Sequence, residues 1–271
     1  MSTVPYARPQ AGAGTELPPP VITTASEPLV SIIIPALNEA RNLPHVMAAL
    51  PQVDEVILVD GGSTDDTVDV ARRLMPGIRV VQQNRRGKGN ALACGFAAAT
   101  GDIIVMIDAD GSTDPREIPS FIAELRAGAD FAKGSRFAGA GGSADITRLR
   151  SGGNRCLSAL VNLLFGTRYS DLCYGYNAFW ARHLDAFALD STTSADGRLW
   201  GDGFEIETLL TLRAARARLR IVEVPSYEQQ RIHGESNLNA FTDGLRVLRT
   251  IAREWPRRRR AAGLPAAERT R

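Results

Sequence analysis

Two aspartates, Asp108 and Asp110, stand one residue apart in the segment VMIDADGSTDP, directly after a run of apolar residues. Carboxylates this close repel each other unless a cation offsets their charge. Together they could hold a hard divalent cation, or one could bind the metal while the other binds sugar hydroxyls. A D-x-D pair alone is a weak signal, because most such pairs are solvated loop acids. Its meaning depends on the elements that position it.

Apolar segments alternate with helix-like segments in the first half of the chain. The expected strands lie at 29–36, 54–60, 78–83, 102–108 and 130–135, and the expected helices at 38–51, 63–75, 89–100 and 114–128. Near-continuous apolar strands separated by helices are typical of a mostly parallel sheet covered by helices on both faces. The sequence therefore predicts an α/β fold, with a single domain over residues 28–255.

Polar side chains follow three of these strands. Asn38 and Glu39 come after the first strand, Asp60 after the second and the D-x-D pair after the fourth. Because ligands bind at the carboxyl ends of strands in open α/β sheets, we expect these side chains to meet in one crevice. The alternative is local: Asp60 would only cap the helix that follows it. A dinucleotide site is disfavoured, because the turn after the first strand, PALNEA, lacks the glycines that a pyrophosphate requires.

The regions flanking the crevice differ in composition. Residues 1–27 are rich in Pro, Gly, Ala and Thr without an apolar period, and residues 256–271 are basic, so we expect both to be disordered tails. The glycine-rich stretch 138–143 is expected to be a mobile loop, either a plain linker or a lid over the crevice.

Composition excludes several classes of protein. The formal net charge of +2 gives no global signature of a nucleic-acid-binding protein. The cysteines Cys94, Cys156 and Cys173 contain no CxxC pair, which favours reduced thiols over a disulfide framework or a zinc site. No stretch approaches the roughly 20 apolar residues that cross a bilayer. We therefore expect a cytoplasmic protein, either free or peripheral at the inner face of the cell membrane.

Five segments, in this order and spacing, resemble the family 2 glycosyltransferases with the Rossmann-like GT-A fold. They are SIIIPALNEARNLPHV, EVILVDGGSTDDT, NRRGKGNALACGFAAATGDIIVMIDADGSTDP, GSRF and VEVPSYEQQRIHGESNLN. Among these enzymes they are most similar to polyprenyl-phosphate sugar transferases of the dolichol-phosphate mannose synthase type. The resemblance covers about residues 29–250.

The resemblance implies roles on the donor side of the crevice. The positions that match nucleotide-sugar-binding residues are Pro35, Asn38 and Glu39 beside the nucleobase, Asp60 at base or ribose, and Lys88 beside the nucleotide. Asp108 and Asp110 match the pair that holds Mg²⁺ or Mn²⁺ against the donor diphosphate. Ser112 stands where synthases of this type usually have a glutamine that can join the metal ligands.

The resemblance also implies an acceptor side. The positions assigned to the acceptor phosphate are Arg136, Arg150, Arg231, His233 and Ser236. Asp171 and Glu207 match acids implicated in catalysis, together with Asp110 and Arg136. Asn237 replaces a lysine that is usual in the family.

The expected activity is that of an inverting, metal-dependent hexosyltransferase. It would move a sugar from a nucleotide-diphosphate sugar of the GDP-mannose or UDP-glucose type to a polyprenyl phosphate. An acceptor phosphate is already ionised at neutral pH, so Asp171 would orient it, or would act as a base toward a hydroxyl acceptor. Two alternatives stay open: a soluble glycan or small-molecule acceptor, and a nucleotide-sugar-binding protein that has lost turnover.

The last expected helix carries a stripe of apolar side chains next to arginines. Phe241, Leu245, Leu248 and Ala252 recur at helical spacing with Trp255, and four arginines follow at 257–260. Such a stripe either packs on the domain's own core or lies on an anionic membrane surface, to which a polybasic segment is attracted.

Overall fold

The structure is a computed structural model, and it describes residues 27–192, 199–234 and 240–262. Two of the sequence expectations, the disorder of residues 1–26 and the acceptor role of Ser236, fall outside these ranges. Position 237, where asparagine replaces the usual lysine, also lies outside them.

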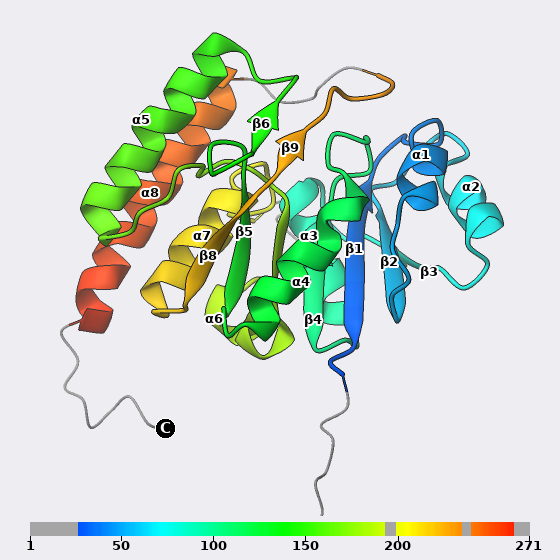
Figure 1. Cartoon of the computed structure of the whole chain (residues 1–271), viewed down its shortest axis with the longest axis horizontal. Coiled ribbons are helices and arrows are strands. Elements are labelled where there is room, and N and C mark those ends of the chain that lie inside the picture. The colour runs from blue at the N-terminus through cyan, green and yellow to red at the C-terminus, as the bar shows by residue number, and fades with distance from the viewer. Residues whose placement is uncertain (1–26, 193–198, 235–239, 263–271) are drawn as a thin grey trace, which may run out of the picture.

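Seven strands form one sheet in the order β3-β2-β1-β4-β7-β5-β8 (Figure 1). Their bounds are β1 Val30–Ala36, β2 Glu55–Asp60, β3 Arg79–Gln82, β4 Ile103–Met106, β5 Phe131–Ser135, β7 Asn177–Trp180 and β8 Ile221–Pro225. Strand β7 pairs antiparallel with β4 and β5, whereas the other pairs are parallel. The predicted mostly parallel α/β fold is confirmed, and the antiparallel β7 is a strand that the sequence did not indicate.

Helices cover both faces of this sheet. They are α1 Leu43–Ala48, α2 Thr67–Leu74, α3 Lys88–Ala98, α4 Ile118–Arg126, α5 Arg148–Phe165, α6 Leu184–Phe187, α7 Ile206–Arg216 and α8 Ala240–Ala262. Successive strand residues point to opposite faces, so Ile32 and Ile34 of β1 pack in a core with α1, α2 and α4. Ile33 between them packs in a second core with α3, α6 and α7.

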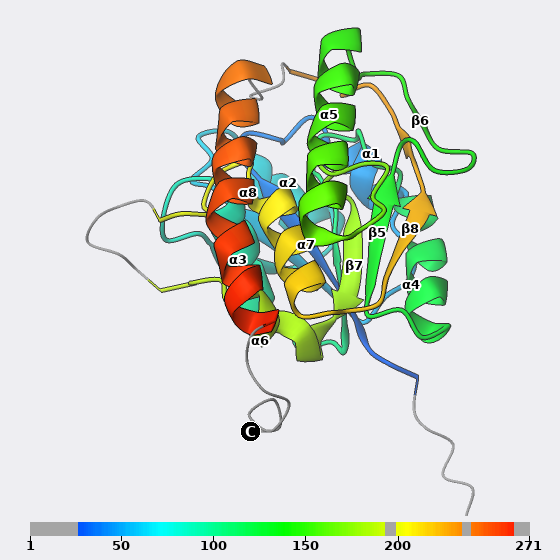
Figure 2. The same cartoon turned by 90° about the vertical axis from the view of Figure 1, so that its left-hand side faces the viewer.

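Helices α5 and α8 lie outside α7 as a further layer on one flank of the molecule (Figure 2). A third core joins the three helices and contains Val161 and Phe165 of α5, Leu212 of α7, and Val247 and Ile251 of α8. Helix α8 continues to Ala262, past the expected end at Trp255. The expectation of a disordered tail beginning at residue 256 is therefore wrong for its first seven residues. No helix within the described residues is long and apolar enough to cross a bilayer.

A small second sheet forms above the carboxyl edge of the large one. It pairs β6, Gly142–Ser143, with β9, Tyr227–Glu228, in parallel. The amide of Ala144 also donates to the carbonyl of Glu228 at 2.8 Å. The glycine-rich loop that was expected to be mobile is thus anchored at its far end.

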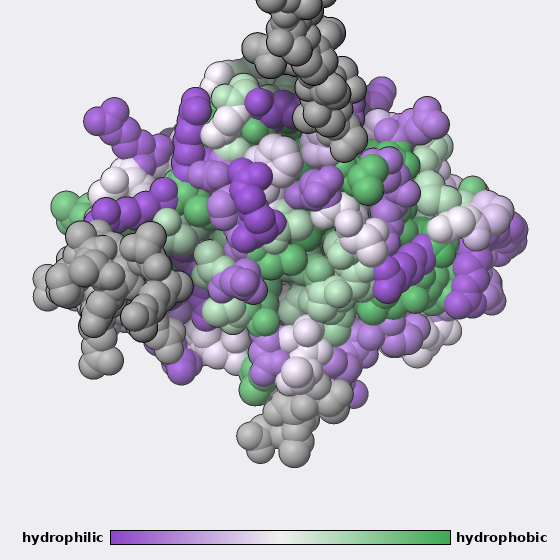
Figure 3. All heavy atoms as spheres, turned by 90° about the horizontal axis from the view of Figure 1, so that it is seen from below, coloured by the Kyte–Doolittle hydropathy of each residue, from purple (hydrophilic) through white to green (hydrophobic). Residues whose placement is uncertain are grey.

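At the opposite edge of the large sheet, hydrophilic and hydrophobic residues are interspersed (Figure 3).

Candidate functional site

A cavity of about 730 Å³ opens at the carboxyl ends of β1 and β4 and reaches the amino ends of α5 and α8. The expected site residues that line it are Pro35, Glu39, Lys88, Asp108, Asp110, Ser112, Arg136, Arg150, Glu207 and Arg231. The strand order explains the meeting, because β1 lies between β2 and β4 and the parallel strands end at one edge. The expected residues absent from the lining are Asn38, Asp60, Asp171 and His233.

The turn after β4 aims both aspartates into the cavity. Gly111 has a φ of 79°, a left-handed conformation that favours glycine. A Cβ atom at this position would lie 2.5 Å from Cδ1 of Ile232, whose amide donates to the carbonyl of Asp110. Ser112 donates to Oδ1 of Asp110 through its amide at 2.9 Å and through its hydroxyl at 2.6 Å. In this structure Ser112 therefore orients Asp110.

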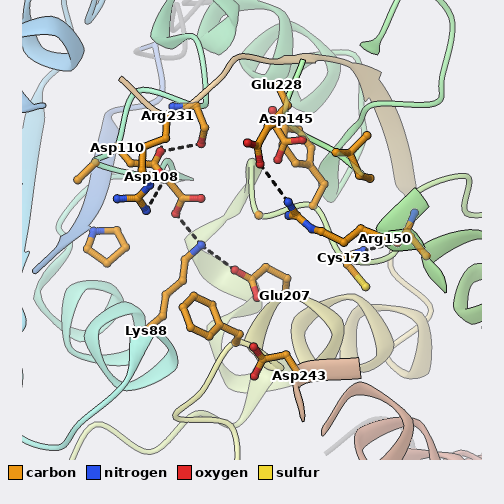
Figure 4. Close-up of a pocket in the computed structure, with 18 of the residues that line it drawn as sticks. Lys88, Asp108, Asp110, Asp145, Arg150, Cys173, Glu207, Glu228, Arg231 and Asp243 are labelled. Carbon is orange, nitrogen blue, oxygen red and sulfur yellow. Dashed lines mark hydrogen bonds and ion pairs between the residues drawn. The ribbon is translucent and has the colours of Figure 1, made fainter. Parts of the chain in front are cut away.

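Each aspartate of the D-x-D pair contacts a different cation (Figure 4). Nζ of Lys88 lies 2.5 Å from Oδ1 of Asp108 and 2.8 Å from Oε1 of Glu207. The guanidinium of Arg231 lies 2.8 Å from Oδ2 of Asp110, and it also lies 3.0 Å from Oε1 of Glu39. Two cations thus offset four carboxylates, which is how the strand end tolerates clustered negative charge.

These contacts fix the charge of Lys88 at neutral pH. Burial alone would lower the pKa of Lys88, but the carboxylates of Asp108 and Glu207 raise it above its ordinary value. Burial raises the pKa of Glu207, although Lys88 opposes the shift, and burial raises the pKa of Glu39 against the effects of Asn42 and Arg231. Lys88 is therefore a cation at neutral pH.

Two glycines hold Lys88 against the segment that leads into α7. A Cβ atom at Gly87 would lie 2.0 Å from the carbonyl oxygen of Asp202, and one at Gly89 would lie 1.7 Å from that of Gly201. The amide of Gly89 donates to the Asp202 carbonyl at 2.9 Å. Arg85 clamps the same segment through a buried ion pair with Asp202 at 2.9 Å. Close backbone packing thus sets the distance between Lys88 and Glu207.

Replacing Gly89 with alanine is expected to destabilise the protein by about 2 kcal/mol, because the new methyl group meets backbone rather than a side chain that can move. Alanine normally stabilises a helix relative to glycine, so the sign is opposite to the usual one. Chemical denaturation measures the change.

Gly152→Ala in α5 is the matched control, since a Cβ atom there meets nothing within 4 Å. It should stabilise the protein by about 0.5–1 kcal/mol. Equal effects of the two substitutions would mean that Gly89 is not tightly packed.

Arg136 lies on the floor of the cavity, where two carboxylates surround it. Its Nε and Nη2 donate to Asp171 at 2.7 and 3.0 Å, and its Nη1 donates to both oxygens of Glu228. The side chain of Asp171 is 0% exposed. Burial alone would raise the pKa of Asp171, but the hydrogen bonds and charge of Arg136 lower it below its ordinary value. Asp171 is thus buried against Arg136 and does not line the cavity. This geometry favours the orienting role over that of a base toward a hydroxyl acceptor, and both stay predictions.

Asn38 and Asp60 organise the turns beside the cavity. The side-chain oxygen of Asn38 accepts from the amide of Thr64 at 2.8 Å, which ties the turn after β1 to the turn after β2. The carboxylate of Asp60 accepts from the amides of Gly62 and Ser63. Burial alone would raise the pKa of Asp60, but these bonds and those from the side chains of Ser63 and Gln82 lower it. Neither side chain faces the cavity, and Asp60 caps its own turn rather than α2, which begins at Thr67.

His233 does not face the cavity either. Its ring centroid lies 6.0 Å from that of His45, and its carbonyl accepts from Nδ2 of Asn42 at 3.2 Å. His233 therefore packs beside α1 and is absent from the cavity lining, and its expected phosphate contact stays a prediction.

The opposite half of the cavity is formed by α5 and α8. Arg150 stands in the first turn of α5, which Thr147 caps by accepting from the Arg150 amide. The guanidinium of Arg150 lies 3.0 Å from Oδ2 of Asp145. Figure 4 shows Arg150 on the side of the cavity away from Lys88 and Arg231.

Glu228 and Asp145 are site residues that sequence reasoning missed. Both line the cavity, and each pairs with an arginine that had been expected there. For Glu228 the sequence offered one signal, because this acid stands three residues before Arg231 in YEQQR. Asp145 carried no such signal, because it lies just after the 138–143 stretch and outside every motif that was recognised.

The donor atoms fit a hard divalent cation. Asp108 and Asp110 present carboxylate oxygens and Ser112 a hydroxyl, which are the ligand types that Mg²⁺ and Mn²⁺ prefer. The described residues contain no group of three or more His, Cys, Asp or Glu side chains that could enclose a metal. The protein would thus supply only part of the ligand sphere, as is usual for a cation bound together with substrate phosphates.

Comparison with known proteins identifies the family. The family model described as "Glycosyl transferase family 2" matches residues 31–186, which include β1, the D-x-D turn and β7. The chain belongs to glycosyl transferase family 2. An undecaprenyl-phosphate mannosyltransferase from Micrococcus luteus is 32% identical over 250 residues, which cover 87% of this chain and 99% of that protein.

Other similar proteins agree with this family. An uncharacterized glycosyltransferase from Mycobacterium tuberculosis is 46% identical over 107 residues, so the match spans 40% of this chain and about half, 48%, of that protein. Glucosyl-3-phosphoglycerate synthase from M. tuberculosis, solved with Mn²⁺, UDP and glucosyl-3-phosphoglycerate, superposes with a TM-score of 0.66. It is 26% identical and covers 85% of this chain and 81% of the solved chain. The predicted GT-A fold is thereby confirmed.

Proposed function

We propose that this glycosyltransferase is a metal-dependent, inverting hexosyltransferase that moves a sugar from a nucleotide-diphosphate sugar to a polyprenyl phosphate. One observation carries the proposal. A single cavity joins the strand-end acids and Lys88 at one end to Arg150 and the apolar side chains of α5 and α8 at the other.

The donor would occupy the half next to the sheet. Pro35, Gly61 and Gln83 line this half beside Lys88, and they would form a partly apolar wall for a base. Lys88 and Arg231 are the cations nearest the D-x-D pair, so they would contact the diphosphate. Mg²⁺ or Mn²⁺ held by Asp108 and Asp110 would supply charge neutralisation for the departing diphosphate. Relatives solved with Mn²⁺ and UDP-glucose support a donor of this class.

Arg231 was expected on the acceptor phosphate, but its contacts with Asp110 and Glu39 favour the donor side. Arg150 remains as the candidate for the acceptor phosphate. Its partner Asp145 is half-exposed, so the pair can open without leaving a buried charge. Apolar residues near it, Leu149 and Leu157, suit the first isoprene units of a lipid chain.

The reaction needs few groups from the protein. An oxygen of the acceptor phosphate forms a bond to the anomeric carbon, while the bond from that carbon to the diphosphate oxygen breaks. The acceptor is already an anion, so no proton has to be removed. The task of the protein is then to hold the two anions in line and to offset their repulsion, with Arg150 on one and Lys88 on the other.

A soluble phosphorylated acceptor is the second candidate, because solved relatives were crystallised with phosphoglyceric acid. Arg150 would serve either phosphate. The two candidates differ in the need for apolar residues, since only the lipid acceptor would contact Leu149 and Leu157. A binding protein without turnover is the third reading, and product formation would exclude it.

The test measures transfer of radiolabelled mannose or glucose from GDP-mannose or UDP-glucose, with Mn²⁺, to undecaprenyl phosphate in detergent and to phosphoglycerate. Arg150→Ala is expected to raise the KM for the phosphate acceptor by roughly tenfold while leaving the donor KM within a factor of about two, because one charge-assisted contact is lost.

Arg182→Ala is the matched control. Arg182 forms a similar half-exposed pair with Asp130 at 3.4 Å but does not line the cavity. An unchanged acceptor KM in Arg150→Ala would remove Arg150 from the acceptor site. Absence of transfer to both acceptors with every donor would overturn the proposed function.

A further inference from the structure

Helices α5 and α8 lie side by side on the outer flank of the molecule, and Figure 2 looks onto their outer surfaces. On α5, Leu149 is 62% exposed and Leu163 is 82% exposed. The residues between them on the same stripe, Gly152, Cys156 and Ala159, are also exposed. Spacings of three and four residues place all five on one face of the helix. Helix α5 therefore shows an apolar stripe to its surroundings along its whole length.

Helix α8 shows a second stripe. Leu245 and Leu248 are 47% and 43% exposed, and Ala252 is exposed as well. The side of α8 that packs on the protein uses other residues, Val247 and Ile251. Leu245, Leu248 and Ala252 of the stripe foreseen from the sequence therefore face outward, whereas its Trp255 packs against the third core. Two neighbouring helices each present leucines outward, which is unusual for a surface in water.

The charged side chains that α5 and α8 themselves expose have one sign. Helix α5 contains no aspartate or glutamate, and its exposed charged residues are Arg148 and Arg155. Helix α8 exposes Arg249 and Arg253. Its two carboxylates are buried: Asp243 near the cavity, and Glu254 where it pairs with two arginines of α7. The outward surface of both helices is accordingly apolar and cationic, without an exposed acid on either helix up to residue 256.

We infer that this α5–α8 face docks on the surface of an anionic lipid membrane. Leucines enter the boundary between headgroups and acyl chains, while arginines beside them contact lipid phosphates. Anionic lipid complements both features of the face at once. A second copy of the chain does not, because a symmetric contact would bring arginines against arginines with no carboxylate to offset them.

The cavity opens onto the same face. Leu149 lines the cavity and is also 62% exposed, in the first turn of α5. A membrane on this face would therefore lie next to Arg150, and a lipid phosphate would reach the cavity without leaving the bilayer. This last consequence rests on the proposed function, whereas docking itself does not.

The test is co-sedimentation of the full-length protein with liposomes, without donor or acceptor, so its outcome does not depend on transfer. Binding is expected to vesicles of phosphatidylglycerol and phosphatidylcholine at low salt, and to weaken at high salt or on pure phosphatidylcholine. The double variant Leu245→Glu with Leu248→Glu should lower the partition coefficient on the order of tenfold or more, because two leucines leave the interface and two charges oppose it.

The matched control adds the same two charges elsewhere. Leu29 and Leu74 are 49% and 46% exposed and lie outside α5 and α8. Leu29→Glu with Leu74→Glu should therefore bind nearly as well as the original protein. Two single variants test the contribution of the arginines. Arg249→Gln should weaken binding to anionic vesicles about fivefold, whereas Arg73→Gln in α2 should leave binding nearly unchanged.

Three results would overturn the inference. The first is no sedimentation with anionic vesicles at low salt. The second is an equal loss in both double-leucine variants, which would assign the effect to net charge alone. The third is a dimer in light scattering that Leu245→Glu with Leu248→Glu dissociates, since the face would then join two copies of the chain. Circular dichroism verifies that each variant is folded.

Discussion

Replacing Asp110 with asparagine is expected to lower the transfer rate by about 10³-fold, with the fold intact. The substitution keeps the shape of the side chain and removes the charge that would hold a divalent cation at the diphosphate. Stability should change by less than about 1 kcal/mol, because Asp110 is one of two carboxylates beside Arg231, and Glu39 remains to pair with it at 3.0 Å. The measurements are initial rates of sugar transfer and thermal unfolding.

A direct measurement of metal binding separates this role from others. Titration with Mn²⁺, followed by electron paramagnetic resonance, should show weaker binding in Asp110→Asn when UDP or GDP is present. Asp69→Asn is the control, since Asp69 is an exposed acid of α2 outside the cavity. If Asp110→Asn turned over at the original rate in both EDTA-treated and Mn²⁺-supplemented assays, the D-x-D pair would have no metal role.

Replacing Arg136 with methionine is expected to cost about 3–5 kcal/mol of unfolding free energy, the typical loss when one partner of a buried ion pair is removed. Asp171 is fully buried, and its contacts with Arg136 at 2.7 and 3.0 Å are charge-assisted hydrogen bonds. Methionine fills much of the volume but leaves that carboxylate without its principal cation. Urea denaturation at neutral pH measures the loss.

A double-mutant cycle tests whether the effect runs through Asp171. Adding Asp171→Asn to Arg136→Met should recover part of the loss, because the uncompensated charge is then absent. Arg182→Met, which breaks a half-exposed pair, should cost less than about 1 kcal/mol. A small loss in Arg136→Met, or a strictly additive cycle, would contradict the pairing.

The pH dependence of stability follows from the same pair. The pKa of Asp171 is lower in the folded protein than in the unfolded chain, so acid adds a proton to the unfolded chain first. The stabilisation is therefore complete above about pH 5 and is lost as the pH falls through the folded pKa. Asp171→Asn should remove that part of the acid slope.

The sequence by itself determined the α/β fold and predicted that polar residues after neighbouring strands meet in one cavity. Apolar strands that alternate with helices can bury both faces only in a parallel sheet, and the carboxyl ends of its strands must share one edge. Residues that directly follow a strand, such as Asp108 and Asp110, are placed by this rule alone. Lys88 was found through its glycines, whose tight packing against residues 201–202 explains why the motif needs them.

Only the tertiary structure decided which polar groups face the cavity. Asp171 and Glu228 both bind Arg136, yet Asp171 is absent from the cavity lining, whereas Glu228 of β9 lines the cavity. The same limit applies to α8, where the sequence indicated a stripe with Leu245 and Leu248, whereas the packing against α5 and α7 buries Val247 and Ile251. Apolar periodicity indicates that a helix has an apolar side. Which side is buried depends on the helices or strands that pack against it, and these come from segments distant in sequence.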